Sequence, residues 1–262
     1  MHCRNGNPLA SGYLGAPADF LRLLEQAGIG PAVVYDIGAS TGVWSEAAAG
    51  VFPDAEFHLF EPLAELAEPY RADLGDRRRR FPAFHVHSVA LGRENGRQRL
   101  FVTKDFYGSS LLYRGALPEV LAVMAETLDV AVHSLDGFQR AHNLPLPDLI
   151  KADCQGAELA ILGGAERCLS NCRALVIETW LSREYGPDTP LLSEVSEWLG
   201  ERDFSLVGLG ETFLDSQHRI YSVDSYFISD AAIEAVWPDA GGGQIRRLVL
   251  AGKSPAAGEA VN

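Results

Sequence analysis

A short apolar run that ends in an acid and a glycine turn constrains this chain more than any other feature. Val33–Ile37 is rich in β-branched residues, and Gly38 and Gly42 follow before the sequence becomes helical. An apolar run of this length is typical of a buried parallel strand, and glycine lets the chain turn sharply and lets a ligand approach the backbone. The stretch therefore predicts a strand, then a ligand-binding turn, then a helix.

The remaining chain alternates strand-like and helix-like segments. This pattern is typical of an α/β, doubly wound, Rossmann-like fold with a mostly parallel sheet. The expected helices are residues 19–26, 43–49, 63–74, 136–142, 156–169 with a break at Gly163-Gly164, 191–199 and 231–236. The expected strands are 33–37, 56–60, 84–91, 99–103, 128–135, 148–152, 174–179, 204–209 and 222–228.

Two pairs of these strands are expected to be antiparallel. Residues 84–91 and 99–103 flank an Asn-Gly turn, which predicts a hairpin. Residues 204–209 and 222–228 are expected to close the sheet as an antiparallel hairpin. The sheet is therefore predicted to be parallel at its centre and antiparallel at one edge.

Composition and charge exclude several classes of partner. The 262 residues, 47% hydrophobic and 22% charged, are enough to bury one large α/β core, so one domain is expected. A formal charge of −13 repels a phosphate backbone, so no nucleic-acid partner is expected. The one basic cluster, residues 77–80, is expected to be a solvated loop balanced by Asp73 and Asp76.

Targeting and cysteine signals are weak. No apolar run approaches membrane-spanning length, and the first residues lack the apolar core of a secretion signal, so we expect a cytoplasmic protein without a membrane partner. The cysteines are too few and too unevenly placed for a disulfide framework and are expected to be structural thiols. They are Cys3, Cys154, Cys168 and Cys172.

Five expected strands end in a polar residue or in one that lets a ligand come close. Ligands of a doubly wound sheet collect outside the carboxyl ends of its strands, where the strand order reverses. Because parallel strands end at the same edge, we expect these residues to gather around one ligand site. They are Asp36, Glu61, Ala90, Asp153 and Glu178.

The turn after the first strand indicates which ligand binds there. A nicotinamide site needs Gly-x-Gly-x-x-Gly, whereas this turn has no middle glycine and carries Asp36 where a diphosphate would approach. A carboxylate instead favours a ligand with an ammonium and a sulfonium, such as S-adenosylmethionine (SAM). Glu61 has two acceptor oxygens that suit the two hydroxyls of a ribose.

Four segments of the chain resemble the FkbM-type methyltransferases, a family within the class I SAM-dependent enzymes. They are Asp-Ile-Gly-Ala-Ser-Thr-Gly at 36–42, Phe-Glu-Pro at 60–62, Ser-Leu-Asp at 134–136 and Lys-x-Asp-x-x-Gly-x-Glu at 151–158. The resemblance spans about residues 33 to 228. The chain departs from the family at Ser40, where asparagine is common, and at Gln155, where glutamate is usual.

The resemblance implies a role for each matching residue. The loop around the methionine part of SAM would consist of Gly38, Ala39, Ser40 and Gly42. Asp36 would serve its ammonium, directly or through water, and Glu61 would hold the ribose. Val89 and Ala90 would lie by the adenine. Three regions follow: an N-terminal segment with a short helix over 1–30, a SAM-binding methyltransferase domain over 31–230, and a C-terminal helix with a tail expected to be disordered over 231–262.

Methyl transfer to a hydroxyl needs alignment and a proton acceptor. The resemblance puts Asp153 near the departing methyl, which makes it the first candidate base, ahead of Glu178, His133 and His218. Each has an alternative: Asp153 as the cap of the next helix, Glu178 as the partner of a loop, and the histidines as structural residues.

The same segment contains residues that could pair with each other or bind a metal. Lys151 and Glu158 are expected to form a structural ion pair. Asp153 with Glu178 offers oxygen ligands to magnesium, but the set of carboxylates is incomplete, so magnesium is not favoured.

The acceptor is less constrained than the donor. The segment 104–117 mixes aromatic residues with hydroxyls, so Ser109 and Ser110 are expected to face the substrate. The resemblance implies O-methylation of a small hydroxylated molecule, plausibly a sugar or a polyketide-type natural product. The alternative is a catalytically silent module that binds a ligand or a partner, and exposed aromatic residues such as Trp237 are compatible with a homodimer.

Overall fold

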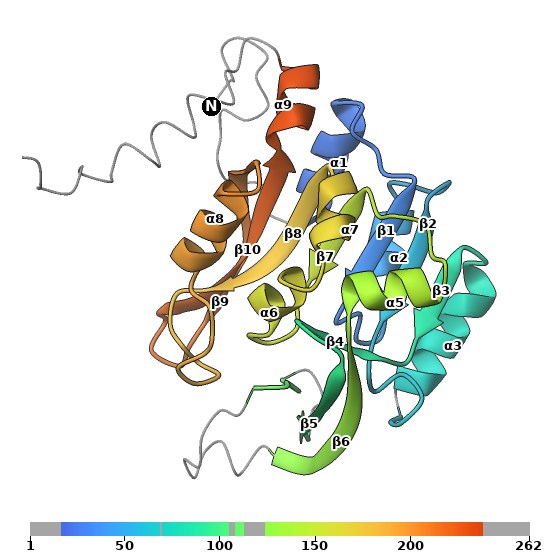
Figure 1. Ribbon diagram of the computed structural model, residues 1–262, viewed down its shortest axis with the longest axis vertical. Helices are drawn as coiled ribbons and strands as arrows, with labels where there is room; N and C mark the ends of the chain where they lie inside the picture. The colour runs from blue at the N-terminus through green and yellow to red at the C-terminus, as the bar shows by residue number, and fades with distance from the viewer. Residues whose placement is uncertain (1–16, 69, 105–107, 113–123, 238–262) are drawn as a thin grey trace, which may run out of the picture.

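A seven-stranded sheet forms the centre of the protein (Figure 1). The computed structural model describes residues 17–68, 70–104, 108–112 and 124–237. The strand order is β3-β2-β1-β7-β8-β10-β9. The strands are β1 (Val33–Ile37), β2 (Glu56–Phe60), β3 (Phe84–His87), β7 (Leu149–Ala152), β8 (Ala174–Trp180), β9 (Phe204–Leu214) and β10 (Ile220–Ser229).

The directions of the strands confirm the predicted fold class. The five strands from β3 to β8 are parallel, and β10 runs antiparallel to both β8 and β9. The order reverses at β1, which has β2 on one side and β7 on the other. The carboxyl ends of β1 and β7 therefore border the crevice in which a doubly wound sheet holds its ligand.

Helices cover both faces of this sheet, as Figure 1 shows. One apolar layer contains the buried residues of α1 (Pro17–Gln26), α2 (Val43–Ala49), α3 (Tyr70–Arg80) and α9 (Asp230–Val236). The other contains those of α5 (Leu135–Ala141), α6 (Glu158–Leu162), α7 (Glu166–Asn171) and α8 (Leu192–Gly200). Alternate residues of each buried strand face opposite layers, so each strand contributes to both.

A second sheet of three strands, ordered β4-β6-β5, extends from the main one (Figure 1). Its strands are β4 (Ala90–Gly92), β5 (Gly96–Thr103) and β6 (Met124–Ser134). The expected hairpin of 84–91 with 99–103 is wrong, because β6 lies between β4 and β5, parallel to the first and antiparallel to the second. Asn95 accepts a hydrogen bond from Ser134 N (2.9 Å), so the Asn-Gly turn also contacts β6.

The segment after β2 differs from the prediction in two ways. The expected helix over 63–74 begins only at Tyr70 and continues to Arg80, and the sequence has a proline just before it, a residue that favours helix starts. The basic cluster 77–80 is therefore the last turn of α3 and not a loop. Arg77 and Arg80 form ion pairs with Glu46 of α2, and cations are favourable at a helix C-terminus.

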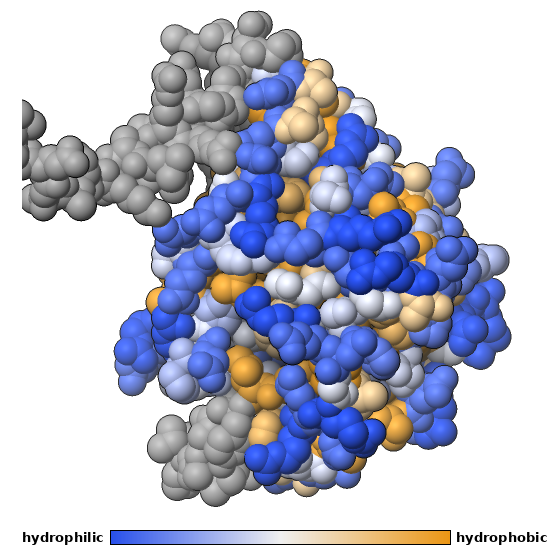
Figure 2. Space-filling view, viewed as in Figure 1, coloured by the Kyte–Doolittle hydropathy of each residue, from blue (hydrophilic) through white to orange (hydrophobic). Residues whose placement is uncertain are grey.

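Apart from α3, the helices follow the prediction closely, whereas the expected strand 84–91 is divided into β3 and β4, which belong to different sheets. The break at Gly163-Gly164 separates α6 from α7, and a Cβ on Gly164 would lie 2.6 Å from Gly92 O. Cys154, Cys168 and Cys172 are free thiols, whereas Cys3 and the tail lie outside the described residues. No helix in the described ranges is both long and apolar enough to span a bilayer. Figure 2 shows a face on which hydrophilic residues dominate and apolar ones form small separate patches.

Candidate active site

A cavity of about 530 Å³ opens at the carboxyl ends of the strands, within the size range of small-molecule sites. Most of the residues that the sequence assigns to a site line it. These are Gly38, Ser40, Glu61, Val89, Ala90, Ser109, Ser110, Asp153 and Glu178. Asp36, Ala39 and Gly42 are not among its lining residues.

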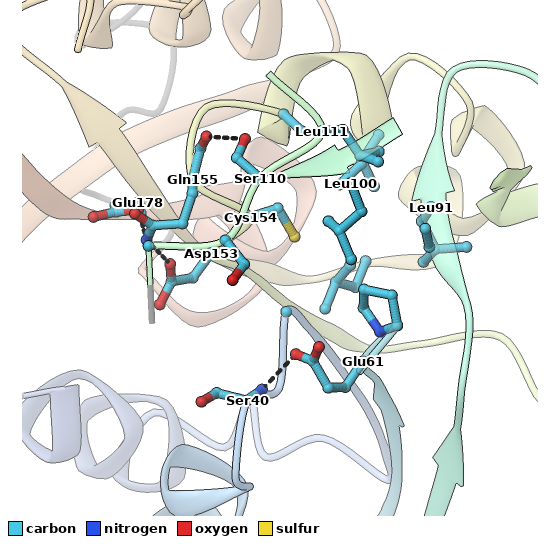
Figure 3. A pocket seen from close by; sticks show the side chains of 18 of the residues that line it. Ser40, Glu61, Leu91, Leu100, Ser110, Leu111, Asp153, Cys154, Gln155 and Glu178 are labelled. Carbon is cyan, nitrogen blue, oxygen red and sulfur yellow. Dashed lines mark hydrogen bonds between the residues drawn. The ribbon is translucent and has the colours of Figure 1, made fainter. Parts of the chain in front are cut away.

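The cavity has a polar side and an apolar side (Figure 3). Asp153, Gln155 and Glu178 lie together on one side, whereas Leu91, Leu100 and Leu111 lie on the other. Glu61 and Ser40 lie at a third side, joined by a hydrogen bond. Such a cavity suits a ligand with a flat apolar part and polar groups at its ends.

The glycine turn is formed by close backbone packing. Gly38 has a φ of 72°, and a Cβ there would lie only 1.9 Å from Asp153 O. Gly38 N and Ala39 N both donate to Phe60 O, at 2.9 and 3.1 Å. Only glycine fits at position 38, because any side chain would strain the backbone and displace the loop that carries Asp153.

Glu61 is fixed by two backbone donors. Its Oε2 accepts from Ser40 N and its Oε1 from Leu63 N, each at 2.9 Å. Burial raises the pKa of this carboxyl to about 7. Each carboxylate oxygen keeps a further lone pair, so Glu61 is able to accept two more hydrogen bonds from a ligand.

Asp36 lies beneath the site. Its side chain has no exposed surface, and its two oxygens contact Ser45 Oγ (2.6 Å) and Lys151 Nζ (3.3 Å). Gly42, at the start of α2, packs against Leu74 and Arg77 of α3 and has a φ of 85°. Both residues therefore stabilise the glycine turn from the side away from the cavity.

Lys151 supplies the positive charge of this region. Its ammonium also lies 3.1 Å from Gly38 O and 3.4 Å from Asp153 Oδ2. Burial alone would lower the pKa of Lys151, but Asp36 and Asp153 raise it above its ordinary value. The expected ion pair of Lys151 with Glu158 is wrong, because the partners of Lys151 are Asp36 and Asp153.

Asp153 faces the cavity with 39% of its side chain exposed. Burial opposes its ionisation, but Lys151 keeps its pKa below the ordinary value. The alternative role as a helix cap is wrong, because the N-cap of α6 is Ala157 and has no side-chain cap. Glu158 instead accepts hydrogen bonds from Cys154 N (2.7 Å) and Gly156 N (3.1 Å) and so shapes the loop.

Gln155 joins the two candidate bases. Its Nε2 donates to Asp153 Oδ1 and to Glu178 Oε2, each at 2.9 Å. Its Oε1 accepts from the hydroxyl of Tyr185. Glu178 also accepts from Ser222 Oγ (3.1 Å), and burial followed by the charge of Asp153 raises its pKa well above the ordinary value.

The sequence analysis missed an aromatic wall next to these carboxyls. Trp180 lies edge-on to Tyr185, with 5.1 Å between ring centroids, and stacks on Tyr221 at 5.9 Å. All three line the cavity together with Phe213. The aromatic residues around the ends of β8 and β10 were the available signal, but their convergence depends on the antiparallel pairing of those strands.

The remaining candidates lie in different surroundings. Ser110 Oγ donates to Gln155 O (2.7 Å) and Ser109 Oγ accepts from Thr103 N (3.1 Å), so both hydroxyls already bind the backbone. His133 and His218 are not among the cavity-lining residues. Among the described residues, no group of three or more His, Cys, Asp or Glu side chains is arranged to hold a metal ion.

Comparisons with solved structures return methyltransferases of low identity. An FkbM methyltransferase from Methylobacillus flagellatus KT has 21% identity and a TM-score of 0.47, over 74% of this chain and 42% of that one. The chain thus spans less than half the length of that protein. A 1,6-didemethyltoxoflavin-N1-methyltransferase of Burkholderia thailandensis, with its substrate and S-adenosylhomocysteine (SAH), has 13% identity and a TM-score of 0.43, over 84% and 80% of the two chains.

A third structure is the N-terminal domain of EvdMO1, in the presence of SAH and D-fucose. It has 10% identity and a TM-score of 0.42, over 81% of this chain and 82% of that one. A comparison with curated proteins finds no match. All three TM-scores are below 0.5, so the assignment depends on the family match.

The family model described as the methyltransferase FkbM domain matches residues 36–206. This range includes the glycine turn, Glu61, Asp153 and Glu178, and it covers more than half of the chain. The resemblance inferred from the four sequence segments is therefore confirmed. The chain belongs to the FkbM methyltransferase family.

Proposed function

We propose that this protein transfers the methyl group of SAM to a hydroxyl of a small molecule, with a sugar or a polyketide-type natural product as the acceptor class. The observation that carries the proposal is the position of Asp153. It is a carboxylate that Lys151 keeps ionised, and it lines the same cavity as Glu61, the residue that would bind the ribose. Donor binding and proton removal thus use different residues of one cavity.

The residues on the donor side fit SAM. Both oxygens of Glu61 are oriented by backbone N–H groups and are able to accept from two ribose hydroxyls. Val89, Ala90 and Leu91 line an apolar part of the same cavity, where an adenine ring would lie. When bound, SAM supplies a methyl group already activated by a sulfonium, so alignment contributes most of the acceleration.

The residues on the acceptor side fit a hydroxyl-bearing molecule. Trp180, Tyr185 and Tyr221 provide flat apolar surface, and Asp153 and Glu178 provide hydrogen-bond acceptors beside it. Asp153 is placed to take the hydroxyl proton, a role worth about 10²- to 10⁴-fold in rate. Ser109, at the cavity wall, retains a hydroxyl proton that it is able to donate to the acceptor.

Calorimetry with SAM, with SAH and with a nicotinamide dinucleotide tests the donor. SAM and SAH are expected to bind and the dinucleotide is not. Binding of the dinucleotide alone would contradict the proposal, and binding of a ligand without turnover of any acceptor would favour the silent module.

A panel of hydroxylated sugars and polyketides, assayed with labelled SAM, tests the acceptor. Label is expected in a methyl ether of at least one compound. Asp153→Asn should reduce turnover by about 10²-fold or more while SAM affinity changes little. Unchanged turnover in this variant would exclude Asp153 as the base.

A further inference from the structure

Gln155 has an unusual position between two carboxyl groups. A single amide nitrogen donates to Asp153 and to Glu178 at the same distance, 2.9 Å. The backbone of Gln155 has a φ of 55°, in the left-handed region that residues other than glycine rarely adopt. Ser110 Oγ donates to its carbonyl (2.7 Å).

The contacts of Gln155 also decide which end of its amide faces the carboxyls. The hydroxyl of Tyr185 donates to Oε1, so Nε2 with its two protons points at the carboxyl oxygens. Tyr185 is itself 3% exposed, and its backbone N–H donates to Thr189 Oγ1 (2.9 Å). The orientation of the amide is therefore determined by a buried side chain on the loop after β8.

Two N–H donors change the chemistry of the carboxyls that they join. Hydrogen bonds donated to a carboxylate favour its charged form, and two carboxyls held close together share the proton that either one accepts. Of the two carboxyls, only Asp153 contacts Lys151, so Glu178 depends on Gln155 and Ser222 for donors. Without Gln155, only the proton that the two carboxyls share would offset their repulsion.

We propose that Gln155 is a positioning residue that holds Asp153 and Glu178 together as one proton-accepting pair, with Tyr185 orienting its amide. The inference rests on the proposed methyl transfer to a hydroxyl. In that reaction the acceptor oxygen forms its bond to the methyl carbon as the carbon–sulfur bond breaks and SAH leaves. The hydroxyl proton passes to the Asp153–Glu178 pair, which carries it until the products depart.

Other titratable groups face this pair. Lys151 contacts both Asp153 and Asp36, Cys154 follows Asp153 in the loop, and Glu158 begins α6 and accepts from Cys154 N. Asp224 is the cross-strand partner of Glu178, and burial followed by the charge of Asp153 raises its pKa to about 7. Glu61 lies farther along the cavity wall. A test must therefore distinguish the pair from these neighbours.

The ratio of SAM affinity to SAH affinity provides such a test without a known acceptor. The two ligands differ by a methyl group and a positive charge, so the ribose contact to Glu61 cancels and the ratio reports the charge near the sulfur. Burial and the charge of Asp153 raise the pKa of Glu178, whereas Lys151 keeps the pKa of Asp153 low, so Glu178 is the group of the pair that loses a proton last. Calorimetric titrations of wild-type protein from pH 5 to pH 9 should show the ratio rising, with a midpoint at the pH where Glu178 loses this proton.

Gln155→Met removes both donors at nearly the same side-chain length. The midpoint of the ratio is expected to rise by about one pH unit, because the charged form of the pair loses two hydrogen bonds. Tyr185→Phe removes the hydroxyl that orients the amide and should produce a smaller rise. Asp224→Asn, which removes a nearby carboxyl but no donor, should lower the midpoint instead. Circular dichroism at each pH checks that all variants are folded.

The outcomes separate the two proposals. A midpoint shared by wild type and Gln155→Met, or a ratio that does not change with pH in the wild type, would overturn the role of Gln155 and leave the proposed function standing. A failure of SAM and SAH to bind at any pH would overturn both.

Discussion

Two buried polar clusters lie on opposite faces of the same sheet, and they differ in whether their buried groups are ionised. At the carboxyl ends, Asp36, Lys151 and Asp153 form ion pairs beside the cavity. On β2 and β3, His58 and His87 share a hydrogen bond of 3.0 Å. The rings around the histidines are Tyr35, His85, Phe60 and Phe138.

Burial raises the free energy of a charge in both clusters, but the opposite charges differ in their exposure. The side chains of Lys151 and Asp36 are 9% and 0% exposed, whereas Glu56, 2.9 Å from His58 Nε2, has a side chain that is 42% exposed. Lys151 keeps the pKa of Asp153 low despite burial. Burial lowers the pKa of both His58 and His87 to about 4, so both rings are neutral at pH 7. The exposed carboxylate of Glu56 does not offset the burial of His58, whereas the buried ammonium of Lys151 does offset the burial of Asp153.

Removing the ammonium of Lys151 should have the largest effect on the stability of the protein. Lys151→Met leaves Asp36 fully buried without a cation, so the free energy of unfolding should fall by about 3 to 5 kcal/mol. Urea unfolding at pH 7.5 measures the loss. Arg97→Met is the matched control, because Arg97 and Asp129 form an ion pair with 64% of each side chain exposed, and its effect should be much smaller. Equal losses would contradict the comparison.

A second change disturbs the backbone under the carboxylates without altering charge. Gly38→Ala should cost about 2 to 4 kcal/mol and abolish SAM binding, because the methyl would overlap Asp153 O and strain a positive φ. Gly28→Ala has nearly the same φ, 71°, with open space around it, so it isolates the backbone strain. Unfolding and calorimetry should show SAM binding retained in the control. Equal losses of stability would show that the close contact contributes nothing.

Glu61 tests whether a buried carboxyl held by two backbone N–H groups binds the ligand. Glu61→Gln keeps the shape but replaces one acceptor oxygen by a donor, so SAM affinity at pH 8 should fall by about 1 to 3 kcal/mol. Its pKa is about 7, so wild-type affinity should also rise as the pH increases through 7, and affinity of the variant should not. Calorimetry between pH 6 and pH 8.5 checks both. Unchanged SAM affinity would remove Glu61 from the site.

The histidine cluster should show the smallest effect at neutral pH and a growing one in acid. Its folded pKa values of about 4 lie below the ordinary value of about 6.5, so its stabilising contribution is present above pH 6.5 and is lost as the pH falls toward 4. Thermal unfolding from pH 7 to pH 4 measures the loss.

Variants of two histidines locate this effect. His58→Gln should weaken the dependence of stability on pH in this range, because one buried ring no longer has to be protonated. His85→Gln removes a neighbour whose side chain is 47% exposed and whose charge lowers the pKa of His58 less than burial does, so it should weaken this dependence less than His58→Gln. The same pH profile in all three proteins would show that the cluster is not the source.

Local sequence predicted the elements of this site well but not its contacts. Val33–Ile37, Val43–Ala49 and Glu56–Phe60 have the predicted bounds, because apolar runs, glycine turns and proline act over a few residues. The hairpin across Asn95 failed, because nothing local shows that β6 lies between β4 and β5. The start of the helix predicted over 63–74 was wrong, because Leu63 and Ala64 reach the core from turns and the helix begins only at Tyr70.

The sequence by itself determined the fold class, the family and the set of carboxyls at the strand ends, because apolar periodicity, glycine turns and motif residues are properties of short segments. Only the tertiary structure decided which residues those carboxyls contact. Lys151 reaches Asp36 and not Glu158 because β1 and β7 are neighbours in register. Tyr185 and Gln155 meet across a loop and a strand end, and such a contact between residues distant in sequence exists only once the chain has packed.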